Sequence, residues 1–258
     1  MEIKPNNIYL GDAYELIKQL PDNFVDLVII DPPYDMATGG TGGEKPLALR
    51  FKNRYAELKQ KKLDVGMNLS FLQELERICK HIYIYIWCNK NLLFKLIAYY
   101  NEREDVNLDL ITWGKTNPMP LCNNHFLNDT EYCLCIHEKG IGWNMNAGFE
   151  VKRKCYMQEV NKADKDKYGH PTIKPLNIIK NFILNSSNEG DLIFDAFMGS
   201  GTVAVAAKEL KRNFLGFELD KDYYKMCCDR INGIDKSGQT SLLDTDFEQM
   251  NLFDIPTD

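Results

Sequence analysis

The chain has 258 residues, a formal net charge of −6 and a hydrophobic content of 44%, which suits one large domain, or one domain with a small insertion. No apolar run approaches the roughly 18 residues of a membrane span, and the N-terminus lacks a secretory pattern. The eight cysteines form no CxxC pair, which argues against a zinc ribbon or a thiol-redox motif. We therefore expect a cytoplasmic protein with no membrane partner.

Short apolar runs alternate with helical patterns along the chain, which predicts an α/β fold with a mostly parallel, doubly wound sheet. Seven strands are expected, at Ile8–Leu10, Val25–Ile30, Ile82–Trp87, Leu108–Trp113, Tyr132–Ile136, Leu192–Asp195 and Phe214–Glu218. The expected helices are Ala13–Gln19, Leu69–Lys80, Lys90–Asn101, Leu176–Asn185, Val203–Leu210 and Lys221–Ile231.

Two segments interrupt this alternation within the expected domain, residues 1–235. Residues 36–66 contain "ATGGTGGEK" and a basic stretch, and they are too long for an ordinary connection, so we expect a functional loop. Residues 138–169 are polar and form a second expected loop insertion. Residues 236–258 make an acidic tail whose composition predicts partial disorder.

A metal site is one reading of the cysteines in the middle of the chain. Cys122 and His125 lie close in sequence to Cys133 and Cys135. Cys133 and Cys135 alternate with apolar residues in a predicted strand, however, and are better explained as buried thiols on one strand face. We expect no metal.

The apolar run Val25–Ile30 ends abruptly at Asp31, Pro32, Pro33 and Tyr34. The Asp31 carboxylate and the Pro32 carbonyl make a rigid pair of hydrogen-bond acceptors, because proline fixes its own φ and restricts the residue before it. Such acceptors can make the exocyclic amine of a base more nucleophilic, although its lone pair is delocalised into the ring. The Tyr34 ring offers a surface for a base taken out of its stack.

A second motif, "DAFMGSGT", follows the predicted strand Leu192–Asp195 and leads into a helix rich in small residues. Gly199 and Gly201 allow a sharp turn and a close ligand approach, but the spacing fits neither GxxxxGK[ST] nor GxGxxG. Asp195 would repel a pyrophosphate and attract an ammonium group. Glu218, 23 residues beyond Asp195, can either bind ribose hydroxyls or cap the next helix. An amine and a ribose together describe S-adenosylmethionine better than a dinucleotide.

With both motifs intact, the chain resembles the DNA amino-methyltransferases of the N6-adenine and N4-cytosine type, and the resemblance covers most of its length. "IYLGDAYELIKQLPDNFVDLVIIDPPY", "ITWGKTNPMP" and "GHPTIKPLNIIKNFI" match further family segments. The motif order, with DPPY before the cofactor turn, resembles the circularly permuted β class. The resemblance implies a Rossmann-like methyltransferase fold that uses S-adenosylmethionine.

The family's motifs also imply which residues form the site. Asp12 would lie near the cofactor's adenine, and Thr172 and Lys174 near its methionyl carboxylate. The expected cofactor-binding residues are Asp12, Asp31, Thr172, Lys174, Asp195, Phe197, Gly199, Ser200, Gly201, Thr202 and Glu218. The expected catalytic residues are Asp31, Pro32, Pro33 and Tyr34.

The expected reaction is direct methyl transfer to the N6 amine of adenine in DNA after base flipping, with no covalent enzyme intermediate. The acid at Asp31 favours adenine, because the cytosine enzymes more often carry serine at that position. An N4-cytosine DNA methyltransferase is one alternative, because the preference at that position has exceptions. An RNA adenine methyltransferase is another, since related NPPY motifs occur in enzymes that methylate RNA bases or glutamine side chains. A non-catalytic subunit that binds S-adenosylmethionine is a more remote alternative, which the intact motifs argue against.

Double-stranded DNA is the expected partner. Relatives that read a defined site often carry a sizeable region before the H-P-T segment, whereas here only residues 138–169 intervene, so recognition is expected to be short, relaxed or shared with residues 36–66. Candidate contacts are Arg50, Lys52, Arg54, Lys115, Lys152, Arg153 and Lys154, although a solvated basic surface explains residues 152–154 almost as well. By analogy, we also expect a homodimer and a cognate restriction endonuclease.

Overall fold

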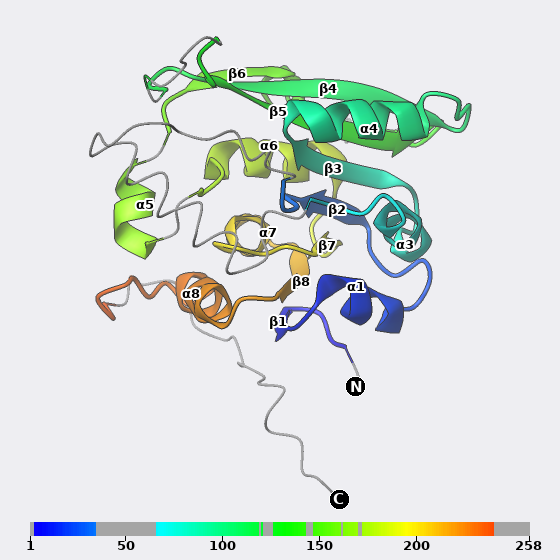
Figure 1. The fold of residues 1–258 in the computed structure, drawn as a ribbon. Helices are drawn as coiled ribbons and strands as arrows, with labels where there is room; N and C mark the ends of the chain where they lie inside the picture. Colours follow the sequence, from blue (N-terminus) through cyan, green and yellow to red (C-terminus); the bar gives the residue numbers. More distant parts are fainter. Residues whose placement is uncertain are drawn as a thin grey trace, which may run out of the picture.

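The computed structural model describes residues 3–34, 66–118, 120, 126–142, 147–160, 162–169 and 172–239. Arg50, Lys52, Arg54, Cys122 and His125 lie outside the described residues, as do residues 36–65 and 240–258. Within the described ranges, one sheet lies between two layers of helices (Figure 1). No helix in these ranges is long and apolar enough to cross a membrane.

The sheet has eight strands: β1 (Asn7–Leu10), β2 (Leu27–Ile30), β3 (Tyr83–Cys88), β4 (Val106–Lys115), β5 (Thr130–Glu138), β6 (Cys155–Gln158), β7 (Leu192–Asp195) and β8 (Asn213–Glu218). Their spatial order is β1-β8-β7-β2-β3-β5-β4-β6. Neighbours run parallel from β1 through β3, and β4 is parallel to β6. Strand β5 is antiparallel to both β3 and β4, so the sheet is mixed.

The expectation of seven strands is one short, because it omits β6 at the edge of the sheet. β6 has four residues, and Tyr156 is the one that is buried. Its hydrophobic run, Cys-Tyr-Met, is three residues long, so it does not stand out from the polar segment around it.

The helices divide between the two faces of the sheet. α1 (Ala13–Leu16), the 3-10 turn η1 (Ile17–Gln19), α3 (Phe71–Ile78) and α4 (Lys90–Tyr100) pack on one face. α6 (Leu176–Ser186), α7 (Thr202–Glu209) and α8 (Lys221–Ile231) pack on the other. The polar segment 138–169 contains the 3-10 turn η2 (Phe149–Lys152), β6 and the helix α5 (Lys162–Tyr168).

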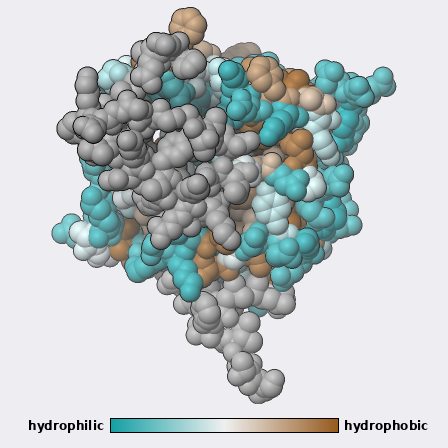
Figure 2. Space-filling model, in the orientation of Figure 1, coloured by the Kyte–Doolittle hydropathy of each residue, from teal (hydrophilic) through white to brown (hydrophobic). Residues whose placement is uncertain are grey.

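Burial on both faces explains why the central strands are apolar throughout. In β2, Leu27 and Ile29 pack under one helical layer, Val28 and Ile30 pack under the other, and all four are fully buried. Helix α3 instead buries one stripe, made of Phe71, Leu72, Leu75 and Ile78. Hydrophilic side chains gather on the outer surface over α1 and α3, along the right of Figure 2.

The parallel strands bring their carboxyl ends to one edge of the sheet. From β7 the chain passes through α7 to β8 on one side, whereas from β2 it passes through α3 to β3 on the other. The connections therefore reverse direction between β7 and β2, which is where open α/β sheets bind their ligands.

Candidate active site

Acidic side chains gather at this edge from opposite ends of the sequence. Asp31 directly follows β2, Asp195 ends β7 and Glu218 ends β8. Asp12 follows β1, whose last residue pairs in register with Glu218. The structure therefore brings together four acids that lie far apart in the chain.

The turn between β7 and α7 is built on two glycines with positive φ, Gly199 at 48° and Gly201 at 73°. Both lie in or near the left-handed region, which glycine adopts at no steric cost. The N–H of Gly199 donates to Oε2 of Glu218 at 2.6 Å, and the N–H of Met198 donates to the Phe217 carbonyl at 2.9 Å. These bonds tie the turn to the tip of β8.

Asp195 is buried beneath this turn, and its Oδ1 accepts from the N–H of Phe197 at 2.9 Å. Burial raises the pKa of Asp195 well above its ordinary value, and the negative charges of Asp31 and Glu218 raise it further. Within the described ranges, no Lys, Arg or His side chain forms an ion pair with Asp195. A ligand that brought an ammonium group would supply the missing positive charge.

Glu218 is also buried, which raises its pKa, while the N–H groups of Asp220 and Gly199 lower it. Its Oε1 accepts from the N–H of Asp220 at 2.9 Å. The cap of α8 is Asp220, whose carboxylate accepts from the N–H groups of Asp222 and Tyr223. Because another residue supplies the helix cap, the capping alternative does not account for Glu218.

The side chains of Ser200 and Thr202 are buried against α8. Arg230 of that helix donates from Nη1 to the Ser200 carbonyl and to Thr202 Oγ1, both at 2.9 Å. Sequence reasoning missed Arg230, which is buried and fixes the turn from behind. Its position within an ordinary amphipathic helix gave no signal.

An aromatic cluster lies beside the turn. The half-buried ring of Phe197 is 5.6 Å from the ring of Phe71 and 6.5 Å from that of Tyr14, measured between centroids. Asp12 caps α1 by accepting from the N–H of Tyr14 at 2.8 Å, and its side chain is exposed.

Asp31 has a partner on each of its carboxylate oxygens. The Tyr34 hydroxyl donates to Oδ1 at 2.6 Å, and Nζ of Lys174 lies 2.7 Å from Oδ2. Burial raises the pKa of Tyr34 well above its ordinary value, and the negative charge of Asp31 raises it further, so the hydroxyl stays protonated. Pro32 is buried and Pro33 half-buried.

Lys174 also contacts Glu131, which sequence reasoning did not select. Nζ of Lys174 lies 2.9 Å from Oε2 of Glu131, and Nζ of Lys115 lies 2.7 Å from Oε1. Burial alone would raise the pKa of Glu131, but the positive charges of Lys174 and Lys115 lower it to about 2. The structure thus places both lysines on carboxylates within the site, whereas Thr172 is exposed.

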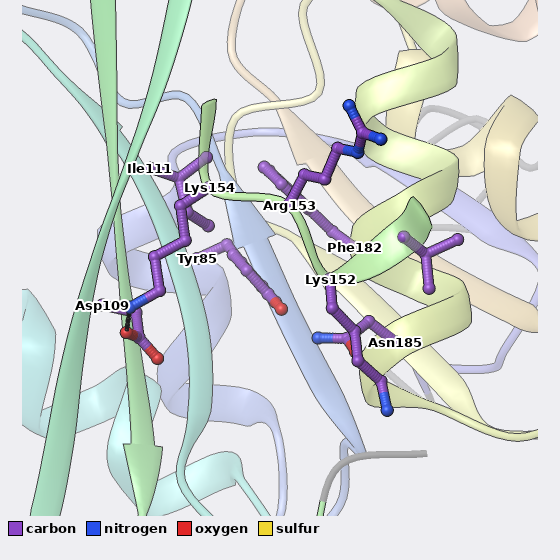
Figure 3. A pocket seen from close by; sticks show the side chains of 9 residues that line it. Tyr85, Asp109, Ile111, Lys152, Arg153, Lys154, Phe182 and Asn185 are labelled. Atoms are coloured by element: carbon purple, nitrogen blue, oxygen red, sulfur yellow. Dashed lines mark hydrogen bonds and ion pairs between the residues drawn. The ribbon is translucent and has the colours of Figure 1, made fainter. Parts of the chain in front are cut away.

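The basic residues at positions 152–154 of the 138–169 segment lie away from the acidic edge of the sheet. Lys152, Arg153 and Lys154 line a pocket of about 180 Å³ between β3, β4 and α6 (Figure 3). Lys154 forms an ion pair with Asp109 of β4. The other lining residues are Tyr85, Asp109, Ile111, Val151, Phe182 and Asn185.

This pocket is remote from the acidic edge. Asp109 precedes Lys115 by six residues in β4, a separation of about 20 Å along an extended strand. The structure therefore does not bring the candidate contacts at 152–154 together with Asp31. Within the described part of the chain, no group of three or more His, Cys, Asp or Glu side chains could hold a metal ion.

Comparison with known proteins agrees with this arrangement. A model of the N6_N4_Mtase family, described as DNA methylase, matches residues 25–228. The Type II methyltransferase M2.LlaDCHI of Lactococcus lactis subsp. cremoris is 28% identical over 238 residues, covering 86% of this chain and 87% of the relative. The Type II methyltransferase M2.MboI of Moraxella bovis is 27% identical over 263 residues, covering 94% of this chain and 92% of the relative.

Solved structures are similar over a comparable share of the chain. The crystal structure of the M1.HpyAVI-SAM complex has a TM-score of 0.60 and 29% identity, and covers 88% of this chain and 98% of that one. The PvuII DNA methyltransferase, described as cytosine-N4-specific, has a TM-score of 0.65 and 17% identity, and covers 88% of this chain and 89% of that one. At 17% identity, the similarity to the PvuII enzyme concerns the fold alone.

Proposed function

Since the chain belongs to the N6_N4_Mtase family of DNA methylases, we propose that it transfers a methyl group from S-adenosylmethionine to the N6 amine of adenine in double-stranded DNA. The observation that carries this proposal is the position of Asp31. Its carboxylate stands at the sheet edge beside Asp195, at the reversal point between β2 and β7.

The residues at the ends of β7 and β8 fit S-adenosylmethionine. When bound, the cofactor supplies a methyl group on a positively charged sulfur. Asp195, buried without a cation among the described residues, suits the cofactor's ammonium group. Glu218 suits the ribose hydroxyls, because each of its oxygens keeps acceptor capacity beyond one backbone N–H.

Asp31 is the proposed acceptor for the base. An N–H of the adenine amine would donate to the Asp31 carboxylate and the other to the Pro32 carbonyl, which raises electron density on nitrogen as it attacks. The new bond joins N6 to the methyl carbon while the bond from that carbon to sulfur breaks. The nitrogen, positively charged at that point, then releases one proton.

Tyr34 has two proposed roles. Its hydroxyl holds Asp31 by a 2.6 Å hydrogen bond, and its half-buried ring offers a stacking surface for a flipped base. Base stacking on an aromatic ring contributes about 1–3 kcal/mol per base. Phe197, Gly199 and Gly201 would complete the cofactor side of the site, with Ser200 and Thr202 held in place by Arg230.

The motif order and the sheet order support membership of the permuted β class. The N-terminal strand β1 lies at the edge beside the C-terminal strand β8, and β8 lies beside β7. The first strand of the chain is thus added to the edge of a half-sheet whose other two strands come from the C-terminal part. This is the arrangement that a permutation of the two halves would produce.

One experiment tests the proposed function and its alternatives. The full chain is incubated with methyl-labelled S-adenosylmethionine and with unmethylated bacterial DNA or total RNA in separate reactions, and the products are digested to nucleosides. We expect label in N6-methyladenine from DNA. Label in N4-methylcytosine would indicate an N4-cytosine DNA methyltransferase, and label in RNA alone would indicate an RNA methyltransferase. Cofactor binding without transfer would indicate a non-catalytic subunit.

The expected protein partners stay predictions. Light scattering of the purified chain tests the homodimer, and protection of methylated DNA against endonucleases from the same source tests the restriction partner. Lys115, 15% exposed and paired with Glu131, is assigned to the active site rather than to a phosphate contact. Lys152, Arg153 and Lys154 remain proposed DNA contacts. Their individual substitution should weaken DNA binding and reduce its salt dependence if they touch phosphates.

A further inference from the structure

Two ammonium groups and two carboxylates alternate in a line that ends on Asp31. Lys115 contacts Glu131, Glu131 contacts Lys174, and Lys174 contacts Asp31, with the paired nitrogen and oxygen atoms 2.7–2.9 Å apart. The exposed fractions of the four side chains lie between 10% and 28%. The line is therefore partly screened from water, and its charges interact more strongly than on an open surface.

Four separate parts of the chain supply the line. Asp31 follows β2, Lys115 ends β4, Glu131 lies near the start of β5, and Lys174 precedes α6. Aromatic rings hold both ammonium groups: Nζ of Lys174 lies 5.1 Å from the centroid of the Trp87 ring, and Nζ of Lys115 lies 5.5 Å from that of Trp113. This placement lets Asp31 and Glu131 contact the same Lys174 ammonium.

We propose that Glu131 is a positioning residue for methyl transfer, which balances the positive charge of Lys115 and Lys174 and so preserves the acceptor strength of Asp31. The proposal rests on the proposed function, in which Asp31 accepts from the attacking amine. Asp31 needs Lys174 to fix its orientation, but positive charge beside Asp31 that no second carboxylate balances would draw electron density away from the base.

The sign of the effect follows from the charge that develops during reaction. The attacking nitrogen becomes positive as its bond to the methyl carbon forms, so additional positive charge nearby slows the step. With Glu131 ionised, the two lysines and two acids cancel. Neutralising Glu131 leaves one uncompensated positive charge beside Asp31, and the transfer rate should fall although no group that touches the base has been removed.

The test compares three variants of the full chain by single-turnover transfer of labelled methyl to unmethylated bacterial DNA at saturating cofactor. Glu131→Gln removes the charge, and Glu131→Gln combined with Lys115→Met restores the balance of charges. Glu76→Gln is the matched control, because Glu76 is 17% exposed and its Oε2 lies 2.6 Å from Nη1 of Arg103. Equilibrium dialysis of labelled cofactor and thermal unfolding are measured on each.

We expect Glu131→Gln to lower the transfer rate at least about tenfold, with the cofactor's Kd changed less than about threefold. The double variant should transfer the methyl group at least about three times as fast as Glu131→Gln. A purely structural role of Glu131 would not give this gain. Glu76→Gln should lose comparable thermal stability and keep the wild-type rate.

Three outcomes would overturn the inference. Glu131→Gln could keep the wild-type transfer rate, or the double variant could be no faster than the single. The cofactor's Kd could instead rise steeply with the transfer rate unchanged, which would assign Lys174 to the cofactor's carboxylate, as the sequence predicts. If the wild-type chain itself transferred no methyl group to DNA, the proposed function would fail and this inference with it.

Discussion

At the scale of single residues, Asp31 is held so firmly that its direction is set before a substrate arrives. Tyr34 fixes one carboxylate oxygen and Lys174 the other. Replacing Asp31 by alanine should therefore lower the methyl-transfer rate at least about a thousandfold, because the acceptor is lost outright. The cofactor's Kd should change less than about threefold, since Asp195 and Glu218 are untouched. Single-turnover transfer and equilibrium dialysis measure the two quantities.

Asp22→Ala controls for the loss of one carboxylate, since Asp22 is 67% exposed and pairs with Arg77 away from the acidic edge. It should leave both quantities near the wild-type values. Near-normal transfer by Asp31→Ala would refute the assignment of the acceptor.

A side chain is poorly tolerated at Gly201 in the cofactor turn. Its φ of 73° is left-handed, and an added Cβ would lie 2.5 Å from Sγ of Cys227. Gly190 has a φ of 87° with no atom within 4 Å of the same position. Gly190→Ala should therefore lose about 1–2 kcal/mol of unfolding free energy from backbone strain. Gly201→Ala should lose at least about 1 kcal/mol more and should also weaken cofactor binding.

Urea denaturation measures both losses. Because the two substitutions add the same methyl group in the same backbone region, the difference between them isolates the contact with α8. Equal losses would mean that Cys227 moves aside and that the turn is not packed as tightly as its distances indicate.

At the scale of elements, α8 supports the cofactor turn through Arg230. Its Nη1 donates to two oxygen atoms of Ser200 and Thr202 at 2.9 Å, and its guanidinium lies over the ring of Tyr168 in α5, 4.8 Å from the centroid. Arg230→Met should reduce the free energy of unfolding by about 2–4 kcal/mol, because buried acceptors lose their donor. Cofactor affinity should fall about tenfold, with the transfer rate at saturation largely retained.

The control lies on the same helix. Lys225 pairs with Asp229 at the surface, with 73% of its side chain exposed, so Lys225→Met should cost about 0.3–0.5 kcal/mol. Urea denaturation and cofactor titration distinguish the two variants. An Arg230→Met protein with wild-type affinity would show that the turn keeps its shape without this helix.

The central elements could be predicted from sequence because both faces of the sheet bury apolar side chains. The edge could not. β6 buries one residue, and α5 buries none, so neither has a periodic apolar pattern. Helix α5 stands in the lysine- and aspartate-rich stretch 162–168, which composition alone assigns to a loop. Both elements are held by the neighbours that they pack against.

The same reasoning explains why Glu131 was missed. Asp31, Asp195 and Glu218 follow or end parallel strands, where ligand-binding side chains are expected. Glu131 lies near the start of its strand, which in a parallel sheet would place it at the opposite edge. Because β5 is antiparallel to β3, with Cys88 opposite Tyr132, its start lies beside the carboxyl end of β3. Strand direction, which no single residue reveals, decided the composition of the site.

At the scale of the whole molecule, two acids titrate in opposite senses, and the stability of the cofactor-free chain should reflect both. The pKa of Glu131 is lowered from 4.5 to about 2, so its stabilising contribution is present above pH 4.5 and is lost as the pH falls towards 2. The pKa of Asp195 is raised above 3.8 by burial, so the folded chain binds that proton more tightly than the unfolded chain. The contribution of Asp195 therefore decreases as the pH rises through 3.8 towards its raised value.

We therefore expect the unfolding free energy of the cofactor-free chain to rise on the acid side and then to fall as Asp195 ionises without a cation. Asp195→Asn should reduce the fall, leaving the part that comes from Glu218, whose pKa burial also raises. The variant should be more stable than wild type at neutral pH while binding the cofactor more weakly. Saturating S-adenosylmethionine should also reduce the fall of the unfolding free energy with pH in the wild type, because the cofactor's ammonium group stabilises the ionised Asp195 carboxylate. Urea denaturation between pH 2 and pH 8 measures each curve, with Asp166→Asn as an exposed control. Parallel curves for wild type and Asp195→Asn would mean that Asp195 is not the group that links cofactor binding to stability.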